Sequence, residues 1–319
     1  MPARSFAVRQ AIKASLFAAL ALGTLAAGAC SRSHSGPRQN DPNAFSWTGP
    51  LAAPGMVQVR NTMGSITVEP SPDNAVHVAA TTSWTRGDPK KDVQFRVVTS
   101  GTAVTVCALW RDGECTAANY STGKQKKGIS FSWSNKSDAS VAFKIQVPAG
   151  VRVDVWTVQG TVNVRSSGPV RARTIDGDVK VGTAVGPVDA ESMNGDVDIR
   201  MTTIGDTGAV RAVTKNGTAV AWVPDITDGR LEASTINGEI GTDFGGPSDE
   251  ARRGSRKFST SIGPGTREYV VQTLNGSAWL RLINADGTVG AKGAEGAAGN
   301  PAAASPKVTK PGVSKKRNQ

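Results

Sequence analysis

The chain has 319 residues, a formal net charge of +11 and only two histidines. This length is sufficient for one large domain or two ordinary domains with a hydrophobic core. His34 lies in a serine-rich stretch, so His77 is the single imidazole in the region that we expect to fold. A histidine-ligated zinc site, a Ser-His-Asp triad or a Cys-His pair needs a specifically placed imidazole, which disfavours most hydrolase chemistry. We predict a protein that is not an enzyme and that uses no metal or cofactor.

Residues 1–29 have the pattern of a secretory signal peptide. Three basic residues precede an apolar run, Leu16 to Ala27, which is too short to span a bilayer. The run ends in small residues, and Cys30 follows directly. This arrangement resembles a bacterial lipobox, in which the cysteine becomes the lipidated N-terminus, although Ala27 stands where leucine is more common. We expect an exported lipoprotein that is anchored through Cys30 at the outer membrane, the periplasm or the cell surface, with simple secretion as the alternative.

The other two cysteines support export. Cys107 and Cys115 are close together in the sequence and can form a disulfide in an oxidising compartment. Cys30 is then the odd cysteine, and an unpaired thiol is a liability in an exported protein. Lipidation of the Cys30 thiol would account for this unpaired cysteine.

Polar segments flank the region that we expect to fold. Residues 30–47 carry the predicted lipidated cysteine and a polar tether, and residues 284–319 form a Gly, Ala, Pro and Lys tail that we predict to be disordered. The signal peptide holds three basic residues, and the tail holds six basic and two acidic residues. Much of the positive charge therefore lies outside residues 48–283. This distribution suggests contact with anionic envelope polymers, such as a polysaccharide or a cell-wall polymer, and not with nucleic acid.

Residues 48–148 form the first part of the predicted fold. Residues 92–98 and 102–110 are good strands on either side of Ser100-Gly101 and predict a β-hairpin. The cysteine pair would close the turn after it. We expect this region to be an N-terminal β elaboration that covers one end of the following repeats, with a separate small domain as the alternative.

A repeat organises residues 149–283. Its consensus is an apolar residue, a small residue two positions later, Thr or Ser two positions later again, and then Asn, Asp or Gln before Gly. Six copies end at Gly160, Gly177, Gly195, Gly217, Gly238 and Gly276, and an earlier relative ends at Gly64. Alternate residues of a strand share one face, and the Asn-Gly pair permits a sharp bend. The period of about 20 residues predicts an all-β, solenoid-like stack of two-strand repeats. An antiparallel meander is the alternative, since Asn-Gly also marks hairpins.

The outward positions of the repeat predict a charge ladder. Six residues before each of the first five glycines the sign alternates, through Asp154, Arg171, Asp189, Arg211 and Glu232. Stacked repeats would bring these side chains about 4.8 Å apart, where opposite charges attract. Each exposed pair contributes only about 0.2–1 kcal/mol. Chance alternation on a solvated face is the alternative.

The segment Val147–Val151, followed by the phased repeats, resembles the bacterial DUF4097 β-strand-repeat family of candidate adhesins. The segment Val104–Cys107, with a second cysteine shortly after it, is similar to that family too. The resemblance covers about residues 57–283 and implies an exported, solenoid-like β domain without a catalytic motif. Lys215 at an apolar position and the long gap before the last repeat depart from the family pattern.

Candidate ligand contacts lie in three kinds of position. Acidic residues at the bends, including Asp176, Asp178, Asp196 and Asp198, could bind calcium or act in glycoside cleavage, but Asp beside Gly is usual turn chemistry. The insertion between Thr242 and Glu268 carries a basic cluster of Arg252, Arg253, Arg256 and Lys257, which could bind a ligand or simply form a solvated excursion. Trp156 and Trp279 occupy outward positions and could stack on sugar rings or cover neighbouring strands, whereas the side of Trp222 stays open.

Three functions follow from these observations. The first is a non-catalytic envelope lipoprotein that presents a solenoid surface for adhesion or for a cell-wall polysaccharide. The second is a self-associating structural or envelope-stress protein. The third is a polysaccharide-active β-helix enzyme, which the alternating charge ladder disfavours. We predict the first.

Overall fold

The computed structural model describes residues 39–110, 113–116, 119–121, 138–182, 185–205, 208–226, 228–244, 250–252, 255–284 and 286–288, with the backbone alone at 250–252 and 255. All of these residues belong to one unit, Gly36–Gln319. The predicted signal peptide, Cys30, Arg253 and most of the predicted tail lie outside the described residues. No helix of the described part is both long and apolar enough to cross a bilayer.

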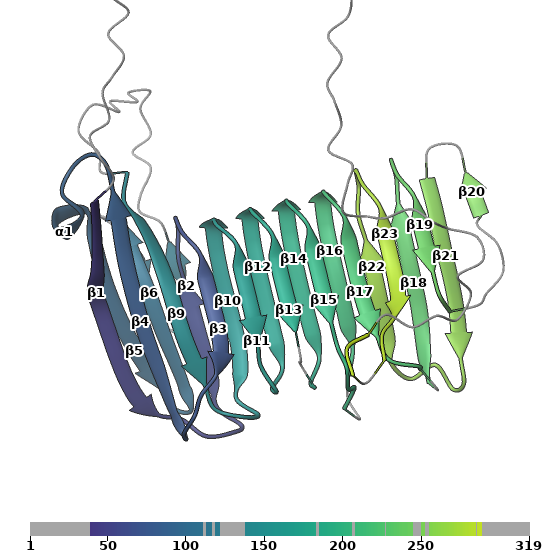
Figure 1. Ribbon diagram of the computed structural model, residues 1–319, viewed down its shortest axis with the longest axis horizontal. Coiled ribbons are helices and arrows are strands. Elements are labelled where there is room, and N and C mark those ends of the chain that lie inside the picture. Colours follow the sequence, from purple (N-terminus) through teal and green to yellow (C-terminus); the bar gives the residue numbers. More distant parts are fainter. Residues whose placement is uncertain are drawn as a thin grey trace, which may run out of the picture. The chain divides into compact units, whose positions relative to one another are not determined.

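The described chain is almost entirely β-structure, and most of it forms two large sheets (Figure 1). Sheet A has the order β1 (Gln39–Pro50), β4 (Ala75–Trp84), β9 (Ser140–Val147), β3 (Ile66–Pro70), β11 (Val162–Arg165), β13 (Val179–Gly182), β15 (Val197–Arg200), β17 (Ala219–Val223), β23 (Ala278–Leu282) and β19 (Ile240–Thr242). Sheet B has the order β20 (Glu250–Arg252), β21 (Ser255–Ile262), β18 (Gly229–Thr235), β22 (Glu268–Gln272), β16 (Val210–Asn216), β14 (Val188–Asn194), β12 (Val170–Asp176), β10 (Arg152–Gln159), β2 (Met56–Arg60), β6 (Ala103–Trp110) and β5 (Val93–Ser100). A small sheet of β7 (Glu114–Cys115) and β8 (Tyr120–Ser121) and the helix α1 (Pro89–Asp92) complete the described elements.

Each repeat contributes one strand to sheet B and the next strand to sheet A, and we call such a pair a rung. Successive rungs pair in parallel and in register, so Val153 faces Val170, and Val170 faces Val188. The predicted stack of two-strand repeats is therefore confirmed. An antiparallel meander is wrong for these repeats, because like positions of successive repeats lie side by side.

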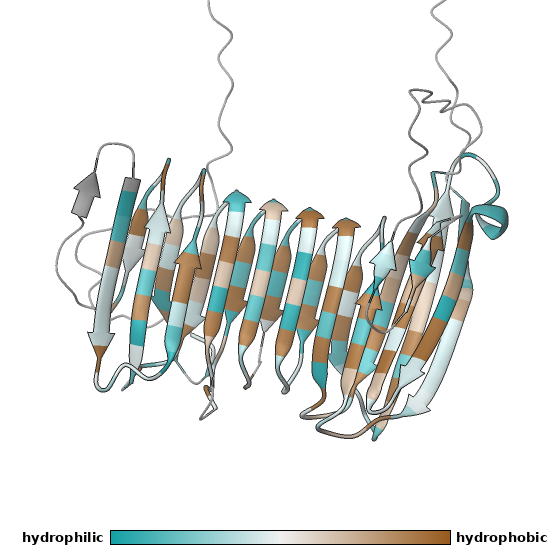
Figure 2. Cartoon of the chain, turned by 180° about the vertical axis from the view of Figure 1, so that it is seen from behind, coloured by the Kyte–Doolittle hydropathy of each residue, from teal (hydrophilic) through white to brown (hydrophobic). Residues whose placement is uncertain are grey.

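The core lies between the two sheets. Val155, Ala172 and Ala190 occupy the same inward position on three successive rungs and are fully buried. Their neighbours along each strand face outward, and Figure 2 shows the resulting alternation as bands of apolar and polar colour along the strands. The small and β-branched side chains at the inward positions let the two sheets approach each other closely.

The glycine of each repeat is required at the bend from sheet B to sheet A. Gly195 has a φ of 151°, and a Cβ at this position would lie 2.1 Å from the carbonyl oxygen of Gly177 on the preceding rung. The Thr214 hydroxyl on the next rung donates to the carbonyl oxygen of Gly195 at 2.8 Å. The same bond is made by Thr157, Thr174, Ser192, Thr235 and Thr273. The hydroxyl position of the consensus thus satisfies a carbonyl group of the preceding rung.

An amide ladder follows the same bend. Asn216 donates its side-chain amide to Asn194 at 2.8 Å, and Asn194 donates to Asp176 at 2.6 Å. Asn275 and Asn237 continue the ladder on the last two rungs. The Asn or Asp before each glycine therefore links neighbouring rungs as well as shaping the bend.

The stack begins earlier than the repeat pattern suggested. β2 and β3 form the first consensus rung, and they pair in parallel with β10 and β11. The predicted boundary at residue 149 therefore falls within one continuous stack. The predicted hairpin is present as β5 and β6, and β6 adds a parallel strand next to β2.

The polar tether predicted for residues 30–47 extends too far. β1 starts at Gln39 and pairs with β4 as the antiparallel edge strand of sheet A. Phe45 and Trp47 alternate along β1 and pack on the core. Phe45 also stacks on Phe95 of sheet B at 4.9 Å, and Phe95 meets Phe143 edge-to-face at 6.1 Å. These rings join the two sheets beside the N-terminal rungs.

The last two rungs are out of sequence order. β22 and β23, which come last in the chain, lie between the rung of β16 and β17 and the rung of β18 and β19. The insertion before them contains β21, which pairs antiparallel with β18, and β20 beyond it. The excursion after Thr242 thus carries the chain past the end of the stack and back, and its described part includes two strands of sheet B.

This rung order predicts which pairs of introduced cysteines can form a disulfide. Val213 of β16 faces Gln272 of β22, whereas sequence order would place it opposite Ser234. Parallel neighbours about 4.8 Å apart are within disulfide range. We expect Val213→Cys with Gln272→Cys to form a disulfide on oxidation, as mapped by mass spectrometry of peptides. Crosslinking of Val213→Cys with Ser234→Cys instead would contradict the inserted rung.

Candidate functional site

The predicted charge ladder is present on the outer face of sheet B over its first four members. Asp154 faces Arg171, Arg171 faces Asp189 and Asp189 faces Arg211. The carboxylate of Asp189 lies 3.2 Å from the guanidinium of Arg171 and 2.8 Å from that of Arg211. This face therefore neutralises its own charges from rung to rung.

The last step of the predicted ladder is wrong. Because β22 is inserted, Arg211 faces Val270, and Glu232 lies on the far side of that strand. The partner of Glu232 is Lys257 of β21, at 3.2 Å. Lys257 was predicted to belong to a ligand-binding cluster, but here it forms an ion pair within sheet B.

A shallow groove of about 390 Å³ crosses the same face where the strands begin. Its lining includes small residues that come just before three neighbouring strands, Pro169, Pro187 and Ala209. It also includes Arg171, Asp189 and Arg211, which are the paired residues of the ladder. The groove therefore offers apolar surface beside charged groups that are already paired with one another.

The acidic residues at the bends bind neighbouring rungs. Asp178 accepts a hydrogen bond from the backbone N–H of Asp196 at 3.0 Å, and Asp196 accepts one from the N–H of Thr218 at 2.7 Å. Turn and ladder chemistry accounts for these carboxylates. Among the residues that the structure describes, no group of three or more His, Cys, Asp or Glu side chains is arranged to hold a metal ion.

His77 lies in an exposed hydrogen-bonded chain on sheet A. Its Nδ1 is 3.2 Å from the Thr48 hydroxyl, and its Nε2 is 2.9 Å from the Asp73 carboxylate. Asp73 also accepts from the N–H of Ala75 and from the Ser71 hydroxyl. The Ala75 N–H, followed by His77, lowers the pKa of Asp73. Asp73 thus holds together the bend that precedes β4, and we assign no reaction to this chain of contacts.

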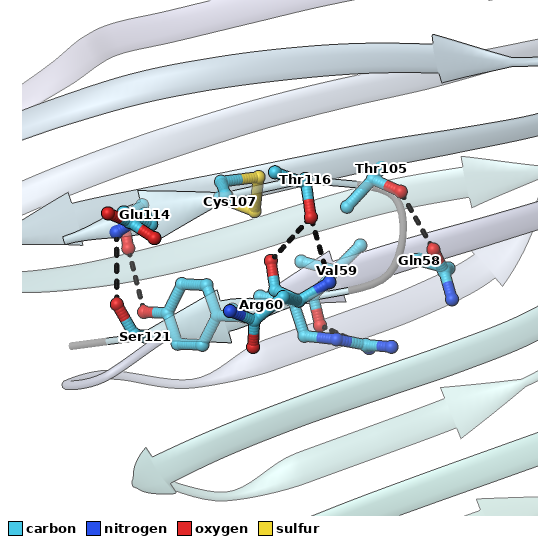
Figure 3. The surroundings of a disulfide bond; sticks show 12 residues. Gln58, Val59, Arg60, Thr105, Cys107, Glu114, Thr116 and Ser121 are labelled. Carbon is cyan, nitrogen blue, oxygen red and sulfur yellow. Dashed lines mark hydrogen bonds between the residues drawn. A yellow bond between two sulfur atoms is a disulfide. The ribbon is translucent and has the colours of Figure 1, made fainter.

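The predicted disulfide is confirmed, and it attaches the small sheet of β7 and β8 to the outer side of sheet B. Cys107 of β6 bonds to Cys115 of β7, with Leu109 and Tyr120 packed beside them. Figure 3 shows the disulfide together with Glu114 and Ser121, which pair across the small sheet of β7 and β8. A small apolar cluster therefore lies on the outer side of the sheet at this end.

Trp156 is part of that cover. It points outward from β10, as predicted, but the ring of Tyr120 packs edge-to-face against it at 5.4 Å. The Tyr120 hydroxyl lies 2.9 Å from the Thr62 hydroxyl and donates to the carbonyl oxygen of Ala108 at 2.9 Å. The structure therefore gives Trp156 a packing role, which was the alternative to a sugar-binding role.

Trp279 occupies a different setting on the opposite sheet. It points outward from β23, and the guanidinium of Arg281 lies 4.5 Å from the centre of its ring. On the neighbouring strand, Trp222 points outward as well, which settles the side left open by the sequence. The guanidinium of Arg200 lies 5.6 Å from the Trp222 ring.

Arginine and tryptophan thus alternate across sheet A. Register pairs Arg200 with Trp222 and Trp222 with Arg281. Further toward the N-terminal rungs, the same face carries Arg165 and Lys180. We call this set the basic–aromatic strip, and it consists of Arg165, Lys180, Arg200, Trp222, Trp279 and Arg281. Cations that flank aromatic faces suit a ligand with polar, partly anionic character and flat apolar patches.

Carboxylates hold the arginines of the strip in place. Arg281 pairs with Asp243 at 2.9 Å, Arg200 with Asp198 at 3.1 Å, and Arg165 with Glu69 at 3.3 Å. Arg165 and Arg200 keep about three-fifths of their side-chain surface exposed, at 61% and 59%, so both remain accessible to a ligand. Arg281 is only 24% exposed and supports the Trp279 ring.

The predicted binding residues are not brought together. Trp156 lies on sheet B under Tyr120, Trp279 lies on sheet A, and Arg256 and Lys257 lie on β21 at the end of sheet B. Arg252 is in β20, where the structure describes only the backbone, and Arg253 lies outside the described residues. The strip residues Arg165, Lys180, Arg200, Trp222 and Arg281 were missed, because their proximity depends on rung register.

The fold and its surfaces define a parallel β-solenoid with short rungs. Residues 134–280 match the model of the Toastrack DUF4097 family. The chain therefore carries a DUF4097 region, and the predicted relationship is confirmed.

Among solved structures, the chain is similar to a candidate cell adhesion protein of Clostridium sporogenes at 7% identity and a TM-score of 0.40, over 75% of this chain and 99% of that one. A candidate adhesin of Bacteroides fragilis is 13% identical with a TM-score of 0.33 and covers 75% of this chain and 98% of its own. A third, from Parabacteroides distasonis, is 10% identical with a TM-score of 0.21 and covers 78% and 98%. No curated protein matches the chain.

The covered position of Tyr120 predicts an unusual pH titration. Tyr120 and Tyr269 are the only tyrosines of the chain. Burial raises the pKa of Tyr120 to about 12 and also raises the pKa of Tyr269. Phenolate absorbance should therefore stay flat as the native protein passes pH 10.0, the ordinary tyrosine value, and rise only above it.

The same shifts link the tyrosines to stability. The native state favours the neutral phenols, so their contribution to stability is complete below pH 10.0. The contribution of Tyr120 is lost as the pH rises through its pKa of about 12, and that of Tyr269 is lost as the pH rises through its own raised pKa. Protein unfolded in urea should titrate at the ordinary value and serves as the control. A native tyrosine that titrates near pH 10.0 would show that the packing of that residue is wrong.

Proposed function

We propose that this protein is a non-catalytic cell-envelope lipoprotein whose solenoid presents the basic–aromatic strip to an envelope or cell-wall polysaccharide. The observation that carries the proposal is the alternation of arginine and outward tryptophan across neighbouring strands of sheet A, with Arg200 exposed beside Trp222. Protein surfaces bind sugars through aromatic faces that stack on the rings and through charged or polar groups that bond the substituents.

The geometry of the strip suits an extended chain. Its members lie on β11, β13, β15, β17 and β23, which are successive strands about 4.8 Å apart. A polymer that crosses the strands therefore meets at least one side chain of the strip on each strand. Such a surface binds by many modest contacts, and these gain strength when several are linked in one ligand.

A binding role without catalysis fits the rest of the molecule. His77 is taken up by the Asp73 turn, and the bend carboxylates bind backbone groups of neighbouring rungs. The ladder residues Arg171, Asp189 and Arg211 on the outer face of sheet B pair with one another. The chain thus uses its reactive side chains to build the stack, and the strip presents exposed cations beside aromatic rings.

Export and anchoring support the same role. The signal-peptide pattern ends at Cys30, and a disulfide between Cys107 and Cys115 is typical of an oxidising compartment. A lipid on Cys30 would place the solenoid at a membrane surface, within reach of envelope polymers.

Binding is tested with the purified full chain on an array of bacterial cell-wall polysaccharides and glycans. We expect binding, and we expect Trp222→Ala and Trp279→Ala to weaken it about two- to tenfold each, since an aromatic stacking contact contributes about 0.5–1.5 kcal/mol. Trp156→Ala is the matched control, because Trp156 lies under Tyr120 on sheet B. An array without any bound ligand, or equal losses in all three variants, would contradict the proposed site.

Anchoring is tested separately by membrane fractionation. Cys30→Ala removes the thioether position, so we expect the variant to move from the membrane to the soluble exported fraction. The native chain should accumulate as an uncleaved precursor when lipoprotein signal peptidase is inhibited with globomycin. Unchanged membrane association of Cys30→Ala would contradict lipidation at this residue.

A further inference from the structure

A notch interrupts the outer face of sheet A within the basic–aromatic strip. Gly182 of β13 lies in register between Arg165 of β11 and Arg200 of β15. A Cβ at Gly182 would meet only the Arg165 side chain among the described residues, at 3.9 Å, which is an ordinary contact distance. The position between the two arginines therefore has no side chain of its own.

At a second glycine on the same face, a neighbouring side chain occupies the space that the glycine leaves. Gly241 of β19 faces Trp279 of β23, and a Cβ at Gly241 would lie 1.9 Å from the Trp279 ring. The indole thus takes up the space that Gly241 leaves. At Gly182 neither flanking arginine does this, because Arg165 pairs with Glu69 of β3 and Arg200 pairs with Asp198 of its own strand.

Three cations lie around the notch, and two of them are paired with carboxylates. Arg165 and Arg200 lie on either side of Gly182, about 9.6 Å from each other across two strand spacings. Arg165 pairs with Glu69 and Arg200 with Asp198. Lys180 lies two residues before Gly182 on the same outward face, is in register with Asp198, and makes no ion pair within the described part of the chain. The surroundings of Gly182 therefore carry more positive than negative charge.

The two arginines keep donors available for a ligand. A guanidinium has five N–H donors in a planar fork. Arg165 gives one hydrogen bond to Glu69, and Arg200 gives Nε and Nη2 to Asp198. These carboxylates orient the arginines, and the remaining donors can bond a planar anion in the notch.

Resting on the proposed function, we propose that the notch at Gly182 is a carboxylate-binding subsite, and that the strip selects polysaccharides with one carboxylate per disaccharide. Trp222 lies two strands from Gly182, beyond Arg200. A carboxylate at Gly182 and a sugar ring on Trp222 are therefore two strand spacings apart, which corresponds to about the length of one disaccharide. Carboxylates on every sugar would bring an uncompensated charge close to Asp198.

The test uses the full chain and two probes that differ only in charge. These are a hyaluronan octasaccharide, which carries one carboxylate per disaccharide, and its methyl ester, which carries none. We expect the native protein to bind the acid at least about tenfold more tightly than the ester, because charge-assisted hydrogen bonds are lost with the ester. Titration calorimetry at constant ionic strength measures both affinities.

Variants at the notch then separate it from general charge attraction. Arg165→Gln with Arg200→Gln should bind acid and ester equally, at about the affinity of the native protein for the ester. Gly182→Glu places a carboxylate between the arginines and should also remove the preference, whereas Gly182→Ala should keep it. Arg152→Gln with Arg171→Gln removes two positive charges from sheet B and should keep the preference as well. Thermal unfolding confirms that each variant is folded.

The outcomes distinguish the subsite from the proposed function. Equal native affinities for acid and ester, or a preference that survives Arg165→Gln with Arg200→Gln, would overturn the subsite and leave polysaccharide binding intact. A preference lost equally in the sheet B control would also overturn it, because general charge attraction would then be the cause. Failure of the native chain to bind either probe or any polysaccharide on the array would overturn both.

Discussion

The bond between a hydroxyl group and the glycine carbonyl of the preceding rung is the contact on which this structure depends. The bend requires a glycine because a Cβ would collide with the preceding rung, as at Gly195 against Gly177. A sharp bend also turns a carbonyl group away from the regular ladder, and a buried carbonyl without a partner is costly. Thr214 supplies the partner for Gly195. Each rung therefore completes the bend of the rung before it.

This dependence gives the outer faces their regularity. Because the rungs are in register, a residue type that recurs in the sequence becomes a column in space. On sheet B the columns carry opposite charges that pair, and on sheet A they carry the arginines, tryptophans and the Gly182 notch. A surface of this kind can be changed residue by residue without altering the core. The core and the proposed binding surface thus lie on different faces of the same strands.

A stack of this kind has to be closed at its ends, and here the two ends are closed differently. At the N-terminal end of sheet A, β4 pairs antiparallel with β1 and with β9, and in sheet B β5 pairs antiparallel with β6. The stacked rings of Phe45 and Phe95 join the two sheets there. At the other end β21 pairs antiparallel with β18 in sheet B, whereas sheet A ends at β19, which pairs in parallel with β23. Phe258 and Phe244 contribute to the core there. An antiparallel strand does not offer the next parallel rung its template, so it stops the repeat from extending in that sheet.

Much of the fold could be predicted from the phased glycines, because apolar, small and hydroxyl positions in six copies specify both the rung and its register. The order of the last two rungs could not, since the copies ending at Gly238 and Gly276 fit the consensus equally well. β1 was missed because its Phe45 and Trp47 follow no repeat. The strip depends on that inserted rung: Trp222 lies beside Arg281 only because β23 precedes β19 in space.

The inserted rung also has a consequence for how the chain is completed. A chain that crosses a membrane from its N-terminus can add rungs one by one up to β16 and β17, each on a finished neighbour. β18 and β19 then leave it without an adjacent rung to pair with, and that place is filled only when residues 268–282 arrive. Residues 268–282 therefore complete the stack by joining β18 and β19 to β16 and β17. A chain cut short before them lacks this connecting rung, so the fold is complete only when the last rung has been synthesised.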